Sequence, residues 1–273
     1  MKQDQYAVMG NPIAHSKSPF IHSLFARQTG QNLNYSSLLV EIDAFESSVN
    51  AFAKNKGKGL NITVPFKQQA WQLVNERSRS AEKAGAVNTI TIHESGKLTG
   101  DNTDGIGLVN DLRTNLKFEL KNKKILVLGA GGAVRGVLGP LLDENPELVV
   151  VANRTIARAV ELEQLFSEDG NIKGVGFEDL ESNAFDLVIN GTAASLNGDL
   201  PPIPASTVHN ACCYDMMYSK EDTVFMAWAR EHEAKQVWDG LGMLVEQAAE
   251  SFFIWRGVRP DTAEVISQVR DAY

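Results

Sequence analysis

The sequence predicts an α/β fold in two domains, and three observations support this prediction. The chain has 273 residues, which is enough for two domains that each bury a core. Apolar runs typical of buried strands alternate with helix-forming stretches along the chain. From residue 125 to residue 136, one such run leads into a glycine cluster and then into helix-forming residues, as at the start of a βαβ unit.

The composition is typical of a folded globular protein and argues against several functions. Hydrophobic residues make up 43% of the chain and charged residues 22%. The net charge of −8 argues against a general nucleic-acid or anionic-membrane binder, and no apolar run approaches membrane-spanning length. The start of the chain lacks an apolar signal sequence, and Cys212 and Cys213 lack metal-ligand spacing. We therefore expect no metal site, reduced thiols and a cytoplasmic protein.

The N-terminal part alternates strands and helices. We expect strands over residues 6–10 and 35–42, a helix over 44–54, a strand that Pro65 ends, a hairpin over 87–92 and 96–100, and a helix over 106–116. Ser18, followed by Pro19, predicts a helix start with the serine as N-cap. Ser16 is not needed for that cap, so the two hydroxyls are equally consistent with capping and with holding a polar ligand.

The segment from Gly59 to Lys67 carries polar side chains at strand spacing. Alternation places Asn61 and Thr63 on one side of the strand. Lys67 then starts the next helix at its positive end, which is an unfavourable place for a cation unless an anionic partner compensates it. The alternative is an ordinary surface lysine with a solvated ammonium group.

Two further polar residues have structural alternatives. Asp104 lies in the polar turn over 101–105, before a helix, where a capping role is common. Asn88 lies at the start of the hairpin, where an amide side chain is able to stabilise the turn.

The second half alternates strand and helix in the manner of a Rossmann-like dinucleotide-binding domain. We expect strands over 125–128, 148–152, 172–176 and 185–190, helices over 133–142 and 155–166, a strand end over 211–218, a helix over 222–233, a short strand and turn over 237–242, and amphipathic helices over 243–255 and 261–273. The two C-terminal helices are expected to return to the first domain.

The glycine cluster is expected to bind a pyrophosphate at a helix N-terminus. Its spacing departs from GxGxxG because Val134 occupies the third glycine position, and an ordinary strand-to-helix turn is the alternative. Where NAD-binding units usually have an acidic residue, this chain has Asn153 and Arg154, with Arg158 one helical turn further on. Guanidinium groups attract a 2′-phosphate, so the pattern favours NADP over NAD; the alternative is that both arginines are solvated helix charges.

Several segments, in order over nearly the whole chain, match the motifs of one known family. They are SKSP at 16–19, NITVPFK at 61–67, GAVNT at 85–89, GDNTDG at 100–105, GAGGA at 129–133, NRT at 153–155, YDMMY at 214–218 and DGLGMLVEQAAESFFIW at 239–255. Together they resemble the shikimate dehydrogenase family.

The resemblance implies an activity and a domain organisation. The activity is the NADPH-dependent reduction of 3-dehydroshikimate to shikimate in aromatic amino acid biosynthesis. The organisation is a substrate domain of residues 1–104 plus 242–273, an NADP domain of residues 105–241, and a site in the cleft between them. The expected partners are this small-molecule substrate and NADP, with no nucleic acid and no membrane, and the expected assembly is a monomer or homodimer.

Carried over residue by residue, the resemblance makes Lys67 and Asp104 the catalytic pair, which suits proton transfer without a metal. It implies that the substrate contacts Ser16, Ser18, Asn61, Thr63, Asn88, Tyr218 and Gln247. It implies that NADP contacts Gly129, Ala130, Gly131, Gly132, Ala133, Asn153, Arg154, Thr155, Arg158, Met216 and Gly240.

The chain departs from the family pattern at three places. Residues 190–193 read Asn-Gly-Thr-Ala, where the family usually has Asn-Ala-Thr-Ser. Arg79 stands where some relatives have an acidic residue, so it is assigned no role. Met217 stands where an aromatic residue often occurs.

Two other functions stay open at this point. One is a paralogue of the same fold that also oxidises quinate, with NAD as cofactor, although the basic group at 153–158 argues against NAD. The other is a sensor that binds NADP without turnover, although the intact pair of Lys67 and Asp104 argues against it. The sequence leaves open which member of the pair carries the proton, the oligomeric state and the extent of cleft closure.

Overall fold

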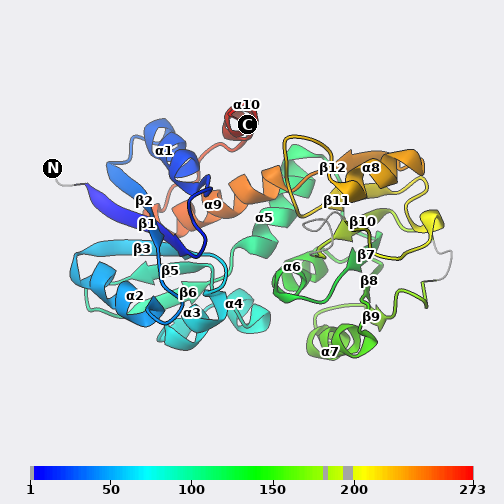
Figure 1. Ribbon diagram of the computed structural model, residues 1–273, viewed down its shortest axis with the longest axis horizontal. Helices are drawn as coiled ribbons and strands as arrows, with labels where there is room; N and C mark the ends of the chain where they lie inside the picture. Colours follow the sequence, from blue (N-terminus) through cyan, green and yellow to red (C-terminus); the bar gives the residue numbers. More distant parts are fainter. Residues whose placement is uncertain (1–2, 181–183, 193–198, 273) are drawn as a thin grey trace. The chain divides into compact units, whose positions relative to one another are not determined.

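The computed structural model describes residues 3–180, 184–192 and 199–272, and in it the chain folds into two units. The first unit comprises Met1–Gly107 and Val245–Tyr273, and the second unit comprises Leu108–Leu244. Each unit contains a six-stranded sheet with helices packed against it (Figure 1). The α/β fold is therefore confirmed, and the C-terminal helices return to the first unit as expected. No described helix is long and apolar enough to cross a membrane.

The sheet of the first unit mixes parallel and antiparallel strands in the order β2-β1-β3-β5-β6-β4. Its strands are β1 (Asp4–Gly10), β2 (Leu33–Leu39), β3 (Gly57–Ile62), β4 (Glu76–Arg77), β5 (Thr89–Ile92) and β6 (Leu98–Asp101). Strands β2, β1 and β3 are parallel, whereas β5 pairs antiparallel with β3 and with β6 in the predicted hairpin. The helices are α1 (Ser18–Gln28), α2 (Phe45–Lys54), α3 (Lys67–Leu73), α4 (Arg79–Ala84) and α10 (Ala263–Asp271), with parts of α5 (Asp104–Asn110) and α9 (Leu241–Arg256).

Side chains of the first sheet alternate between two cores. Ala7 and Leu60 belong to the core that α2 and α3 cover. Tyr6 packs on the opposite face, where its ring lies against that of Trp255 on α9, with centroids 4.8 Å apart. Because side chains of a strand alternate with a period of two, Asn61 lies on the α9 side of the sheet, opposite Leu60.

The start of α1 differs from the prediction that Ser18 is its N-cap. Lys17 is the N-cap, with φ −83° and ψ −10°, and Ser18 is already helical. The Ser18 N–H, one of the donors that a helix start leaves without a partner, donates to Ser16 Oγ at 3.3 Å. The prediction was wrong because the hydroxyl two residues earlier reaches this amide, so the helix begins one residue sooner.

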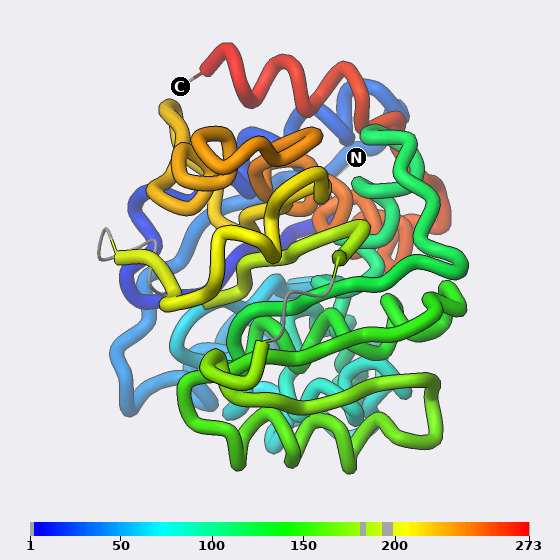
Figure 2. Tube along the Cα trace, turned by 90° about the vertical axis from the view of Figure 1, so that its right-hand side faces the viewer, coloured from blue at the N-terminus to red at the C-terminus, as the bar shows by residue number. Residues whose placement is uncertain are grey.

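The sheet of the second unit is entirely parallel, in the order β12-β11-β10-β7-β8-β9. Its strands are β7 (Lys124–Leu128), β8 (Leu148–Ala152), β9 (Ile172–Val175), β10 (Leu187–Asn190), β11 (Cys212–Asp215) and β12 (Gln236–Trp238). Figure 2 shows the green strands β7, β8 and β9 side by side. The helices are α6 (Gly132–Asp143), α7 (Ile156–Phe166) and α8 (Val224–Glu231), with a π-helical turn at Asp111–Asn115 and a 3₁₀ turn at Ala205–Thr207.

Both faces of the parallel sheet are buried, which explains the continuous apolar runs of its strands. Ile125 and Val127 face a core that includes residues of α6 and α7. Leu126 and Leu128 face a second core that includes residues of α8. Read from β9 to β12, the strand order is that of a dinucleotide-binding sheet, with the topological switch point between β7 and β10.

Helix α9 is tied to the first unit by charged side chains. Arg256 donates to Asp4 Oδ2 at 2.6 Å and to Gln31 Oε1 at 2.8 Å. The buried Glu246 accepts a hydrogen bond from Thr262 Oγ1 at 2.5 Å. These bonds hold α9 against β1 and against the segment that leads into α10.

The glycine at position 191 is explained by the packing of α6. Val134, at the third glycine position of the cluster, is fully buried. A Cβ atom at Gly191 would stand 2.5 Å from Val134 Cγ2 and 3.0 Å from Met216 Sδ, which is closer than packed carbon atoms approach. The departures from the common patterns at 134 and at 191 therefore compensate each other sterically.

We expect Gly191→Ala to lower the free energy of unfolding by about 1–3 kcal/mol, because a methyl group added to a filled core displaces its neighbours. In a Val134→Ala background, which removes the obstructing methyl groups, the same substitution should cost less. Chemical denaturation of all members of this double-mutant cycle measures the difference. Equal costs in the two backgrounds would show that Val134 does not restrict residue 191.

Candidate active site

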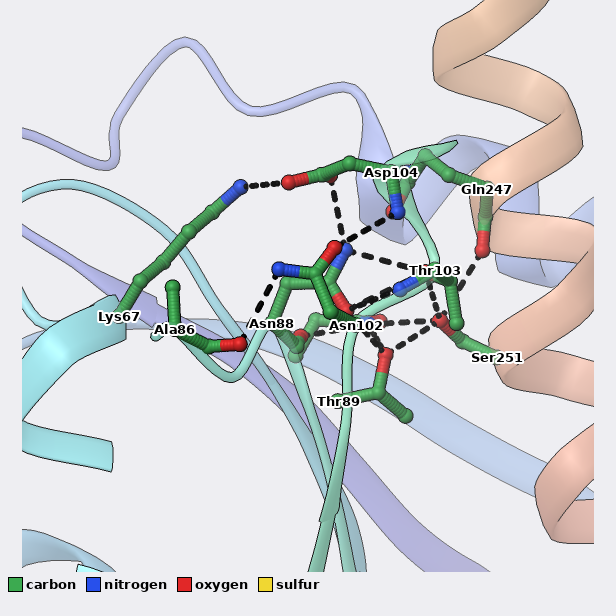
Figure 3. Close-up of polar contacts among 10 residues, drawn as sticks. Lys67, Ala86, Asn88, Thr89, Asn102, Thr103, Asp104, Gln247 and Ser251 are labelled. Carbon is green, nitrogen blue, oxygen red and sulfur yellow. Dashed lines mark hydrogen bonds and ion pairs between the residues drawn. The ribbon is translucent and has the colours of Figure 1, made fainter. Parts of the chain in front are cut away.

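The side chains of Lys67 and Asp104 form an ion pair in the first unit (Figure 3). Lys67 is the first residue of α3, and Asp104 is the first residue of α5. Lys67 Nζ lies 2.6 Å from Asp104 Oδ2, so the carboxylate is the anionic partner that a lysine at a helix N-terminus requires. The two side chains are 30% and 14% exposed, which leaves the pair accessible to a small ligand.

Asn88 holds the second carboxylate oxygen of Asp104. Its Nδ2 donates to Asp104 Oδ1 at 2.8 Å and to Thr103 Oγ1 at 3.0 Å, and its Oδ1 accepts from the Thr103 N–H at 2.9 Å. The Asp104 N–H donates to Asn102 Oδ1 at 3.1 Å. Because each carboxylate oxygen has its own donor, the orientation of the Asp104 carboxylate is set by the protein itself.

Asn61 is almost entirely buried, at 7% exposure, and all of its amide hydrogens have acceptors inside the protein. Its Oδ1 accepts from the Tyr35 hydroxyl at 2.7 Å. Its Nδ2 lies 3.0 Å from Ser251 Oγ and 3.2 Å from both the Asn88 carbonyl oxygen and Thr89 Oγ1.

Tyr35 and His22 form an uncharged aromatic pair beside Asn61. Their rings stack with centroids 4.0 Å apart and an interplanar angle of 6°. Burial lowers the pKa of His22 to about 3 and raises the pKa of Tyr35 well above its usual value. Near neutral pH the Tyr35 hydroxyl is therefore always protonated and donates to Asn61.

The other residues expected to contact the substrate lie on several elements. Ser16 and Ser18 lie at the start of α1, and Thr63 directly follows β3. Gln247 is a half-buried residue of α9. Tyr218 belongs to the second unit, where it follows β11. Among the residues described, no group of His, Cys, Asp or Glu could hold a metal ion.

Sequence reasoning missed the hydroxyl groups that complete the cluster around the ion pair. Hydrogen bonds join Lys67, Asp104, Asn88 and Asn61 with four residues that were not predicted, namely Tyr35, Thr89, Thr103 and Ser251. Ser251 stands four residues after Gln247 in a helix, so helical spacing was the available signal that the two share a face.

The glycine cluster of the second unit presents open backbone at a helix N-terminus. Gly129 turns the chain with a φ of +100°, which favours glycine, and Ala130 follows it. Gly131 is the N-cap of α6, which has no side-chain cap and no acidic residue in its first turn. A Cβ at Gly131 or Gly132 would meet no atom within 4 Å, and both glycines are exposed, as is Ala133. This geometry fits a phosphate group on the helix N–H donors.

Basic residues follow β8. Asn153 Nδ2 donates to the Thr155 carbonyl oxygen at 2.9 Å, and Thr155 is the N-cap of α7. Arg154 and Arg158 are exposed, and neither guanidinium forms an ion pair with a residue that the structure describes. The first turn of α7 also lacks acidic residues. The end of β8 therefore fits the 2′-phosphate of NADP, which guanidinium groups bind through two hydrogen bonds at once.

Met216 and Gly240 meet at the carboxyl ends of β11 and β12. The Gly240 N–H donates to the Met217 carbonyl oxygen at 2.9 Å, and a Cβ at Gly240 would overlap the Met216 carbonyl oxygen. The buried Asp215 accepts from the Met217 N–H at 3.0 Å and from Thr223 Oγ1 at 2.6 Å. This end of the sheet is where open parallel sheets bind their ligands.

Three family models match successive parts of the chain. The shikimate dehydrogenase substrate binding domain matches residues 8–90. The shikimate/quinate 5-dehydrogenase model matches residues 112–198. The shikimate 5′-dehydrogenase C-terminal domain matches residues 240–270.

Relatives and solved structures agree with these matches. The chain is 58% identical to a shikimate dehydrogenase (NADP(+)) of Alkalilimnicola ehrlichii, covering 98% of each chain, and 56% identical to that of Marinobacter nauticus, covering 99% of each. An Ael1 enzyme from Pseudomonas putida has 46% identity and a TM-score of 0.94, covering 97% of this chain and 98% of its own. Thermus thermophilus shikimate 5-dehydrogenase, solved with NADP(H) and shikimate, has 31% identity and a TM-score of 0.87, covering 99% and 100%. The chain therefore belongs to the shikimate dehydrogenase family.

Proposed function

We propose that this protein catalyses the reversible NADPH-dependent reduction of 3-dehydroshikimate to shikimate, a step of aromatic amino acid biosynthesis. The observation that carries the proposal is the ion pair of Lys67 and Asp104. Lys67 lies within residues 8–90, which the substrate-binding model matches, and Asp104 lies in the same unit. The curated relatives at 58% and 56% identity are named as NADP-dependent shikimate dehydrogenases, which supports the same reaction here.

Lys67 and Asp104 serve as the acid–base pair. Reduction of a ketone needs a hydride at the carbon, which NADPH supplies when bound, and a proton at the oxygen. Lys67 has ammonium hydrogens beyond the one shared with Asp104, so it can donate to the carbonyl oxygen and stabilise the developing negative charge. Asp104 holds the ammonium in place, and Asn88 holds Asp104.

Hydroxyl and amide side chains bind the hydroxyls and the carboxylate of the substrate. We assign the carboxylate to Ser16 and Ser18 and the hydroxyls to Thr63, Asn61, Asn88, Tyr218 and Gln247. The amide hydrogens of Asn61 and Asn88 already have acceptors within the protein, so a substrate hydroxyl must replace one of these acceptors.

NADP binds to the second unit. Backbone N–H groups of residues 129–133 at the start of α6 would hold its pyrophosphate, and Arg154 and Arg158 would hold its 2′-phosphate. Asn153 and Thr155 shape the turn at the end of β8. Met216 and Gly240, which contact each other beyond β11 and β12, would contact the nicotinamide end of the cofactor.

We also propose a cytoplasmic location and a monomeric or homodimeric state. Cys212 and Cys213 are buried free thiols, which fits a reducing compartment. Size-exclusion chromatography with light scattering measures the state of assembly directly.

Initial rates, followed by nicotinamide absorbance with shikimate or quinate and NADP or NAD, test the proposed function. We expect turnover of shikimate with NADP to exceed every other combination. Comparable rates with quinate or NAD would identify the broader paralogue. Binding of NADP without any turnover would identify the sensor.

Lys67→Ala should reduce kcat by about 10²–10⁴-fold, because positioned acid–base groups contribute roughly that much to a rate. Calorimetric affinity for NADP should be unchanged, since the cofactor residues lie in the other unit. Lys97 is a matched control: it forms an exposed ion pair with Glu76, also at 2.6 Å. Lys97→Ala should leave turnover intact, and near-normal turnover in Lys67→Ala would remove Lys67 from the chemistry.

Arg154→Asp should raise the KM for NADP by about 10–100-fold, the value of a lost charged hydrogen bond, and should change the KM for NAD far less. Lys235 is exposed just before β12, at the opposite edge of the sheet, so Lys235→Asp makes the same change in net charge away from the site. An equal loss for NADP and NAD in Arg154→Asp would mean that Arg154 does not bind the 2′-phosphate.

A further inference from the structure

Ser251, a residue of α9, places its side-chain hydroxyl in the polar cluster around the ion pair (Figure 3). The residue is fully buried, at 0% exposure. Its Oγ lies 2.7 Å from Thr89 Oγ1, 3.0 Å from Asn61 Nδ2 and 3.3 Å from Thr103 Oγ1. It also lies 3.0 Å from the Gln247 carbonyl oxygen, one turn earlier in the helix.

The partners of Ser251 come from three separate segments of the first unit. Asn61 belongs to β3, Thr89 belongs to β5, and Thr103 lies just before α5. A single hydroxyl oxygen therefore connects α9 to each of them. The Gln247 carbonyl is an acceptor for the Ser251 proton, which leaves the oxygen lone pairs for the hydrogens of Asn61 and of a threonine.

The cluster leads directly from Ser251 to the catalytic pair. The Thr89 and Thr103 hydroxyls lie 2.9 Å and 3.2 Å from Asn88 Oδ1. The amide hydrogens of Asn88 then hold Asp104 and Thr103. Any shift of the two threonines alters how Asn88 presents Asp104, because buried networks of this kind act as a unit.

We infer that Ser251 is a positioning residue, which fixes Asn61 and, through Thr89, Thr103 and Asn88, the carboxylate of Asp104. It contacts neither the substrate nor the reacting atoms in this role. The inference deepens the proposed function and rests on it, since it concerns the same site. It assigns a role in substrate recognition to a serine of the C-terminal helix, about 190 residues from Asn61 in the sequence and joined to it by a hydrogen bond.

Two substitutions separate the oxygen of Ser251 from its packing. Ser251→Ala removes the oxygen with almost no change in volume, whereas Ser251→Thr keeps the oxygen and adds a methyl group to a filled site. Ser23→Ala is the matched control, because Ser23 lies on the exposed side of α1 and its Oγ donates to the Phe20 carbonyl oxygen of the same helix at 2.7 Å. Kinetic constants for shikimate and NADP, shikimate affinity by calorimetry and thermal midpoints are measured for all four proteins.

We expect Ser251→Ala to lower kcat/KM for shikimate by about tenfold, because small displacements of a positioned group are costly, while the KM for NADP stays unchanged. Ser251→Thr should retain more of kcat/KM than Ser251→Ala even where its thermal midpoint is lower. Ser23→Ala should match the wild type.

Two results would overturn the inference, and they are distinguishable from failure of the proposed function. Ser251→Ala with unchanged kcat/KM and a lower thermal midpoint would make Ser251 purely structural. If kcat/KM fell in proportion to the thermal midpoint in both Ser251→Ala and Ser251→Thr, Ser251 would again be purely structural. A wild-type protein that neither binds nor turns over shikimate would instead refute the proposed function, and the inference would fall with it.

Discussion

The two oxygens of the Asp104 carboxylate have different donors, and the arrangement of the candidate site depends on this division. Lys67 Nζ donates to Oδ2 at 2.6 Å, and Asn88 Nδ2 donates to Oδ1 at 2.8 Å. A carboxylate with a single partner could rotate about its bond, whereas two opposed donors fix its plane. The elements that supply these donors are consequently held together as well: the start of α3, the turn before β5 and the start of α5.

The second unit has a different arrangement, in which open backbone at the start of α6 fits a phosphate group. Its parallel sheet places the ends of β7 and β10 side by side, and the turn after β7 has no side chains that would block the start of α6. Packing inside this unit is correspondingly tight. Val134 packs so close to residue 191 that a Cβ atom there would stand 2.5 Å from its Cγ2. Val134 in the glycine cluster is therefore compatible with a glycine directly after β10.

Helix α9 contributes to the site by its inner face as well as by its predicted contact, Gln247. Its C-terminal end is held by Arg256, whose guanidinium bonds to Asp4 and Gln31 near the first strands. Ser251, between these two residues, connects the helix to the hydroxyl network. Such an arrangement keeps the polar side chains of a largely buried cluster satisfied, which is the condition under which buried polar groups rigidify a site instead of destabilising it.

Local patterns in the sequence were sufficient for the α/β architecture, the hairpin of β5 and β6, the helix that begins at Lys67, and the βαβ unit, because each depends on residues close together in the chain. Motifs were also sufficient to identify the family. Only the tertiary structure decided that Ser16 contributes to the start of α1, that the amide hydrogens of Asn61 are already used, and that Ser251 belongs to the cluster. These features depend on hydrogen bonds whose partners lie up to 190 residues apart or on the exact reach of one hydroxyl, and the local periodicity of a sequence carries no information about such distances.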